Sequence, residues 1–322
     1  MSAFRLGATG REVKQIQARL AELGFYRGPL DADYGGGTEA AVVAFQRAHQ
    51  LDTDGVVGDG TWRALFTGNP PAAPEFHGKP LNYRALVLEA TIETDLPAPD
   101  CFSALVGDFD GQGFSFGALQ FAFVAGGFGD LVHLVDAAHP GLVDDLFHTN
   151  AAPLRAAIAG GHEQRLRWAQ SIQAPANRVL FEPWRGLIRS FGRTPECQAA
   201  QLKWAEGRWL KALGLCREYG LWSERGAALM FDIVIQNGSI GPDVKQRILG
   251  DVERLPRTLS RGDSEVERMK IVGRRRAEAS AARWVPQVLA RKLMIATGRG
   301  TIHGRAFDLE ADFGLRLVDR AV

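Results

Sequence analysis

Apolar residues recur at helical spacing in three short stretches between residues 5 and 66. In the first, REVKQIQARLAELG, four of them share one helical face: Val13, Ile16, Leu20 and Leu23. The second, TEAAVVAFQRAHQ, and the third, GTWRALF, each follow a turn rich in Asp and Gly, so one turn–helix unit occurs twice, from Asp31 and from Asp54. The pattern predicts a small three-helix domain over residues 1–68.

A different pattern begins at Leu81, after a proline-rich stretch. Residues 69–80, NPPAAPEFHGKP, hold four prolines and no hydrophobic period, which predicts a semi-rigid linker. Helical periodicity then appears in six segments: 81–94, about 128–137, 153–173, 194–219, 223–236 and 264–296. Strand-like character is confined to about 103–121. We therefore expect a mostly α (α+β) chain, whose larger helical domain, residues 81–322, contains one small β element.

Composition narrows the classes of function. A chain of 322 residues with 46% hydrophobic content has room for two domains and a sizeable core. The formal net charge of +1 gives no reason to expect a nucleic-acid partner. Residues 261–322 carry thirteen Lys/Arg against eight Asp/Glu, so transient contact with an anionic outer-membrane or membrane surface is a hypothesis, through Arg274, Arg275 and Arg276.

The cysteines and the N-terminus indicate where the chain folds. Three cysteines at unrelated spacings suit a reduced chain, and no metal or cofactor motif is visible, so no cofactor is expected. The first residues, MSAFRLGATG, lack the apolar segment of a signal peptide, which predicts synthesis in the cytoplasm. No run approaches eighteen apolar residues, and we expect a monomer without a transmembrane helix.

Residues 6–62 carry a specific pattern of short motifs. It reads LG-x2-G-x-EV-x2-IQ-x2-L, then GF, DYG, FQ and finally DGVVG-x2-TW. This pattern resembles the peptidoglycan-binding modules attached to many cell-wall hydrolases. The resemblance implies peptidoglycan as the partner, and we expect Asp33 and Tyr34, on the turn before the second helix, to contact it.

Acidic residues cluster between Leu86 and Phe121. Glu89 and Glu93 lie four residues apart on an apolar helix, which Pro97 and Pro99 should end near Thr94 because proline disfavours helix at the residue before it. Asp108 and Asp110 follow in a glycine-rich segment. Glycoside hydrolysis uses two carboxyl groups that different elements of the fold bring to one cleft.

The segment DGQGFSFGALQF, Asp110 to Phe121, resembles that of bacterial chitosanases in the lysozyme superfamily. Their catalytic Glu lies about eighteen residues before this Asp, and Glu93 lies seventeen before Asp110. Its ending, GALQF, also resembles a strand of goose-type lysozymes and lytic transglycosylases. A later segment, Ser223 to Gly241, resembles a second chitosanase motif. The chain departs from the chitosanases at three positions that favour another substrate: Gln112 for Arg, Gln120 for Gly and Asn237 for His.

The resemblance implies a lysozyme-like fold and assigns roles to several residues. Glu93 is expected to be the general acid, kept protonated by apolar neighbours such as Phe114, Phe116 and Phe121, with Glu89 as its competitor. Asp110, or its rival Asp108, would activate water or stabilise positive charge. Smaller roles follow for three more residues: Ser115 would position water, and Gln112 and Gln120 would contact substrate.

These features together predict a modular peptidoglycan hydrolase of the phage endolysin type, an N-acetylmuramidase that cleaves the β-1,4 bond between amino sugars. It would be made in the host cytoplasm and act on the wall in the periplasm after release. Two alternatives stay open: a lytic transglycosylase, which uses one Glu and no water, and a non-catalytic wall-binding protein. A chitosanase is disfavoured by the binding module and the substitutions above.

Overall fold

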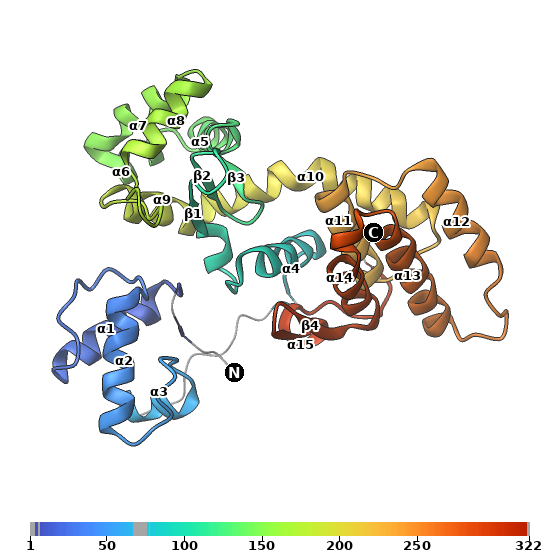
Figure 1. Cartoon of the computed structure of the whole chain (residues 1–322), viewed down its shortest axis with the longest axis horizontal. Helices are drawn as coiled ribbons and strands as arrows, with labels where there is room; N and C mark the ends of the chain where they lie inside the picture. The colour runs from blue at the N-terminus through green and yellow to red at the C-terminus, as the bar shows by residue number, and fades with distance from the viewer. Residues whose placement is uncertain (1–3, 6, 67–75, 77, 321–322) are drawn as a thin grey trace. The chain divides into compact units, whose positions relative to one another are not determined.

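The computed structural model describes residues 4–5, 7–66, 76 and 78–320 (Figure 1). Contacts between Cα atoms divide the chain into two compact units, residues 1–75 with 96–100, and residues 76–95 with 101–322. Most of the predicted linker, residues 69–80, lies outside the described residues, so its semi-rigid character stays a prediction.

The first unit contains the three predicted helices, α1 (Arg11–Glu22), α2 (Gly36–Ala48) and α3 (Asp59–Leu65). Their apolar faces enclose a small core that includes Val13, Ile16, Leu20, Tyr34, Val42, Phe45 and Trp62. The three-helix domain expected from the hydrophobic pattern is therefore confirmed.

Two buried glutamines make equivalent hydrogen bonds in the two copies of the internal repeat. The amide nitrogen of Gln17 donates to Asp31 Oδ1, to the Asp33 carbonyl and to Thr38 Oγ1, and its oxygen accepts from the Ala32 amide. Gln46 makes the same four bonds one repeat later, to Asp54 Oδ1, the Val56 carbonyl and Thr61 Oγ1, and from the Gly55 amide. Each buried glutamine thus satisfies polar groups of one Asp/Gly turn and holds that turn against the core.

The second unit is built mainly of helices. They are α4 (Leu81–Thr94), α5 (Gly127–Ala138), α6 (Leu142–Phe147), α7 (Ala151–Ala159), α8 (His162–Ser171), α9 (Trp184–Arg193), α10 (Pro195–Glu218), α11 (Glu224–Asn237), α12 (Pro242–Glu253), α13 (Arg261–Glu278), α14 (Val285–Thr297) and α15 (Leu309–Phe313). Helix α4 has the predicted bounds. The predicted helix 264–296 is two helices, because Pro286 in the first turn of α14 disfavours helix in the residues before it.

Two small antiparallel sheets accompany these helices. Strands β1 (Leu105–Gly107), β2 (Phe114–Phe116) and β3 (Phe121–Ala122) form a meander in which Val106 pairs with Ser115 and Ser115 with Ala122. This is the β element expected at 103–121. Strands β4 (Arg299–Ile302) and β5 (Arg305–Asp308) form a hairpin that the sequence reading missed. The predicted mostly helical, α+β class is confirmed.

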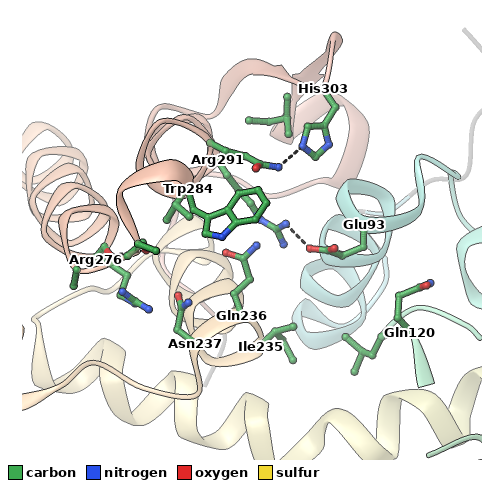
Figure 2. Close-up of a pocket in the computed structure, with 16 residues that line it drawn as sticks. Glu93, Gln120, Ile235, Gln236, Asn237, Arg276, Trp284, Arg291 and His303 are labelled. Carbon is green, nitrogen blue, oxygen red and sulfur yellow. Dashed lines mark hydrogen bonds and ion pairs between the residues drawn. The ribbon is translucent and has the colours of Figure 1, made fainter. Parts of the chain in front are cut away.

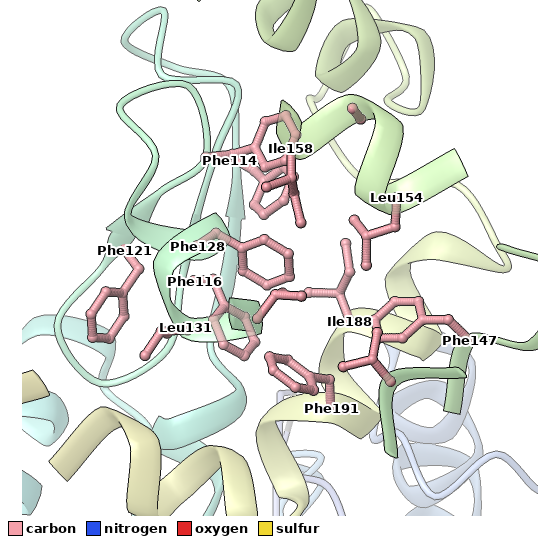
Figure 3. Packing of buried hydrophobic residues seen from close by; sticks show 14 of the residues in the cluster. Phe114, Phe116, Phe121, Phe128, Leu131, Phe147, Leu154, Ile158, Ile188 and Phe191 are labelled. Carbon is pink, nitrogen blue, oxygen red and sulfur yellow. The ribbon is translucent and has the colours of Figure 1, made fainter. Parts of the chain in front are cut away.

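The core of the second unit near the meander is aromatic (Figure 3). Phe114 stacks on Phe123 with ring centroids 4.7 Å apart, and Phe116 meets Phe128 edge-on at 5.1 Å. Side chains alternate across β2, so its two phenylalanines are buried while Ser115 between them faces outward. The sheet is thereby fixed to α5 and α9.

Helix α4 is buried around its whole circumference, because every residue from Arg84 to Ile92 is buried. It packs against α10, α11 and α15. Near its start, Arg84 forms a buried bidentate ion pair with Glu224 of α11, with N–O distances of 2.9 and 2.7 Å. This pair sets the position of α4 relative to α11. No helix among the described residues is long and apolar enough to cross a membrane.

Candidate active site

A cleft of about 710 Å³ opens at the C-terminal end of α4 (Figure 2). Its walls come from the ends of α4 and α11, the turn before β3, the segment joining α13 to α14, and the β4–β5 hairpin. The residues that line it include Glu93, Leu119, Gln120, Gln236, Asn237, Arg276, Trp284, Gln287, Arg291 and His303. The volume lies in the range of pockets that enclose small ligands.

Glu93 sits in the last turn of α4. The helix ends because Asp95 adopts a left-handed conformation, with φ at 56°, and Pro97 and Pro99 follow. The Glu93 side chain is 40% exposed, and its Oε1 accepts a hydrogen bond from Arg291 Nη1 at 2.5 Å. Within the described part of the chain Oε2 accepts no hydrogen bond, so this oxygen can meet a ligand in the cleft.

Arg291, on α14, joins three carboxyl groups from two other helices. Its Nη2 donates to Glu89 Oε2 at 2.7 Å, and its Nε donates to Asp232 Oδ1 at 2.5 Å. With the bond to Glu93, each of the three guanidinium nitrogens has a carboxyl partner. The planar guanidinium suits this arrangement because its donors point in fixed directions. Arg291 therefore fixes the orientation of Glu93 relative to α11 and α14.

Lys292 completes this cluster from the neighbouring position on α14. Its ammonium is fully buried and contacts Asp232 Oδ2 and, at 2.6 Å, Gln236 Oε1. Asp232 and Gln236 stand four residues apart on α11, as Glu89 and Glu93 do on α4, so each pair lies on one helical face. Polar faces from three helices thus meet where a hydrophobic core would otherwise form.

The two acids of α4 differ in how far they are buried. Glu89 is completely buried, and its Oε1 has no hydrogen-bond partner among the described residues. Burial and the nearby Asp232 carboxylate raise the pKa of Glu89 well above its ordinary value, against the opposing effect of Arg291 and Lys292. Although burial alone would raise the pKa of Asp232, Lys292 and Arg291 lower it. Of the two fully buried acids, Glu89 therefore favours its neutral form, and Asp232 stays ionised beside Lys292 and Arg291.

The second acidic cluster, Asp108 and Asp110, does not line the cleft. Asp110 is exposed in the turn between β1 and β2, where its Oδ1 accepts from the Gln112 amide at 3.1 Å, and it does not line the cleft. Asp108 is buried and accepts from the Gly113 amide and from Gln170. Both aspartates hold the turn in shape, as side chains of Asp commonly do.

The other predicted contacts divide between the cleft and the sheet. Gln120, with φ at 51°, lines the cleft beside Leu119. Ser115 and Gln112 are half-buried in the meander and its turn and do not line the cleft. The phenylalanines expected beside Glu93, Phe114, Phe116 and Phe121, are instead in the aromatic core. That expectation is wrong because their strands turn these side chains toward α5, α9 and α10.

In the first unit, Tyr34 is a core residue rather than a surface contact. It is fully buried and its hydroxyl donates to the Gly55 carbonyl at 2.8 Å. Burial raises the pKa of this hydroxyl. Asp33 is half-buried, and its carbonyl accepts from Gln17. The phenol of Tyr34 therefore packs the domain and offers no surface to a polymer.

Most residues that line the cleft were given no role by the sequence patterns. Trp284, half exposed, and Arg291 lie more than 180 residues beyond Glu93, and no local motif marks either of them. Gln236 and Asn237 belong to the segment from Ser223 to Gly241 that resembles a chitosanase motif. Arg276 belongs to the run of three arginines that begins at Arg274. Among the described residues, no three His, Cys, Asp or Glu side chains gather as metal ligands.

Residues 9–65 match the model of a family described as putative peptidoglycan binding domain. Curated relatives include the N-acetylmuramoyl-L-alanine amidase CwlM of Mycobacterium tuberculosis, 37% identical over 76 residues, 20% of this chain and 19% of that protein. The spore cortex-lytic enzyme of Bacillus subtilis is 47% identical over 61 residues, 19% of this chain and 20% of that protein. The chain thus spans about a fifth of the length of these relatives.

Two solved structures are similar over most of the chain. The native chitosanase of Bacillus subtilis MY002 is 18% identical with a TM-score of 0.42, covering 72% of this chain and 97% of that one. The Burkholderia AP3 phage endolysin is 20% identical with a TM-score of 0.20, covering 72% and 98%. Both scores lie below 0.5, so neither likeness bears on the site.

The charge cluster makes a prediction about stability. Asp232→Asn should lower the free energy of unfolding by about 3–5 kcal/mol, because it leaves buried cations without their carboxylate. Glu89→Gln should cost much less at pH 7, since the amide oxygen can still accept from Arg291. Urea unfolding of the two variants beside the wild type measures this, and equal losses would contradict a neutral Glu89.

The same experiment repeated across pH tests the direction of the Glu89 shift. Because its pKa is raised in the folded state, the stability that Glu89 contributes is complete below its unfolded pKa, near 4.5, and is lost as pH rises through the folded pKa. The stability of the wild type relative to Glu89→Gln should therefore fall as pH rises above about 4.5. A relative stability that rises instead would mean an ionised Glu89.

Proposed function

We propose that the chain is a peptidoglycan hydrolase that cleaves a glycosidic bond, with Glu93 as the general acid. The observation that carries the proposal is the position of Glu93: it is the one carboxyl group lining the described cleft, and one of its oxygens is free to meet a ligand. A general acid must reach the leaving oxygen of the substrate directly. Glu89, the competing candidate for the acid, is fully buried and cannot reach a substrate.

The cluster behind Glu93 holds the acid in position. Burial raises the pKa of Glu89 and so favours the proton on that buried acid. Arg291 meanwhile keeps the carboxyl group of Glu93 aimed at the cleft through Oε1.

The remaining cleft residues suit a carbohydrate. Trp284 presents a half-exposed ring, an apolar surface with a polar edge that can lie against a sugar ring. The side-chain amides of Gln120, Gln236, Asn237 and Gln287 line the same space and offer both donors and acceptors to hydroxyl and acetamido groups. An apolar platform with a few placed polar groups is typical of sites that bind small ligands.

The polymer is inferred from the first unit. Its family is described by peptidoglycan binding, and the amidase and the cortex-lytic enzyme carry names of wall-degrading proteins. These relatives support the wall polymer as the partner, but their printed activities differ and do not identify the bond. For the bond we rely on Glu93 and on the resemblance of residues 110–121 to glycosidases.

Within this proposal, the favoured activity is that of an N-acetylmuramidase of the endolysin type, acting on the wall after release from the cytoplasm. Among the described residues, Glu93 alone brings a carboxyl group to the cleft, which specifically favours a second candidate, a lytic transglycosylase, because that reaction needs one acid and no activated water. Asp110, expected to activate water, is held in an exposed turn outside the cleft. Both candidates depend on Glu93, whereas a non-catalytic binding protein does not.

Substitution of Glu93 tests the proposal directly. Glu93→Gln keeps the size of the side chain and an acceptor for Arg291 but cannot deliver a proton, so the rate on purified murein should fall by roughly 10²- to 10⁴-fold. Asp110→Asn is the matched control, since Asp110 lies outside the cleft, and its rate should stay close to that of the wild type. Circular dichroism establishes that both variants are folded.

A folded Glu93→Gln variant with a near-normal rate would refute the acid role. A severe loss in Asp110→Asn would show that the turn moves to bring its carboxyl group to the substrate.

The binding role of the first unit has a separate test. A chain beginning at residue 69 should sediment with insoluble murein several-fold less than the full chain, because the module that matches the peptidoglycan-binding family is gone. Its rate on soluble glycan fragments should be unchanged. Equal sedimentation of both chains would contradict a binding role for residues 1–68.

A further inference from the structure

One cation in the cleft is not part of the charge cluster. Arg276 lies near the end of α13 and lines the cleft beside Ala279, Ser280 and Trp284. In Figure 2 it and Asn237 lie to one side of Trp284, and Glu93 and Gln120 lie to the other. Arg276 therefore stands across the cleft from the acid.

Arg276 has no carboxylate partner among residues 4–5, 7–66, 76 and 78–320. Its Nε is buried and makes no hydrogen bond there. Its neighbour Arg275 contrasts with it, donating to Asp251 at 2.6 Å and to Glu278 at 2.8 Å. Burial lowers the pKa of Arg276, yet a guanidinium stays charged in proteins. A half-buried, unpaired cation is costly, which calls for an anion from outside the chain.

Asn237 supplies a second unfulfilled group on the same side of Trp284. It is the last residue of α11 and lines the cleft. No hydrogen bond of the described residues uses its amide nitrogen, so this donor can meet a ligand. A side-chain amide beside a guanidinium can donate to one oxygen of a carboxylate while the guanidinium binds the other.

We propose that Arg276 and Asn237 form a subsite for a carboxylate of the glycan substrate, next to the sugar that meets Glu93. This deepens the proposed function and rests on it for the identity of the polymer. Peptidoglycan offers such a group from two sources, the lactyl carboxylate of a muramic acid without peptide, and the carboxylates of the stem peptide. A cationic glycan such as chitosan would instead be repelled by Arg276.

The test compares binding of charged and uncharged forms of one ligand. In the full chain carrying Glu93→Gln, which prevents turnover, calorimetry measures the affinity for a peptide-free murein tetrasaccharide as free acid and as methyl amide. A second pair of ligands tests the stem peptide as the source. It consists of one muropeptide with its stem carboxylates free and one with only those carboxylates amidated. Each measurement is repeated with Arg276→Gln, and with Arg274→Gln as the matched control, since Arg274 is exposed on the same helix.

The subsite predicts that the acid form from one of these sources binds at least about tenfold more tightly than its amide. Arg276→Gln should abolish this preference, Arg276→Lys should restore part of it, and Arg274→Gln should leave it unchanged. Equal affinity for acid and amide from both sources would overturn the subsite, as would a preference that survives in Arg276→Gln. Failure of Glu93 as the acid would appear only in the rate measurements, so the two proposals can fail separately.

Discussion

A single buried guanidinium holds the second unit's cleft together. Arg291 has a carboxyl partner for each of its nitrogens, and these partners come from α4 and α11 while the arginine itself comes from α14. Removing charges from water is costly unless they are paired, so the three helices can meet only in the arrangement that pairs them. The position of Glu93 follows from this requirement. Its carboxyl group is the one member of the cluster that is partly exposed to the cleft.

The two units solve a similar problem with different chemistry. In the first, Gln17 and Gln46 hold polar turns by neutral hydrogen bonds, which fix a shape and leave no group to react. In the cluster around Arg291, charged side chains are buried beside Glu89, whose Oε1 has no hydrogen-bond partner among the described residues and whose pKa is raised by burial. The first arrangement suits a module that only binds, whereas the second suits a site that must move a proton.

Local signals in the sequence predicted local structure well. Pro97 and Pro99 fixed the end of α4, and the repeated Asp/Gly turns marked the small domain, because each depends on backbone preferences of neighbouring residues. The cleft could not be predicted in this way. Arg291 pairs with Glu93 across 198 residues, and only packing of whole helices brings them together. Asp110 and Tyr34 show a second limit, since the structure places Asp110 in an exposed turn that it stabilises itself and buries Tyr34 in the core.

The proposed hydrolysis of a glycosidic bond of peptidoglycan can be followed in the chemistry of the newly formed chain ends. Purified murein is digested by the full chain in water enriched in ¹⁸O, and the fragments are analysed by mass spectrometry. Muramidase action should give new reducing ends on N-acetylmuramic acid that carry one ¹⁸O atom. Anhydro-muramic ends without label would retain an acid-catalysed cleavage but contradict hydrolysis. Intact glycan strands with label in new carboxyl groups would rule out glycosidic cleavage altogether.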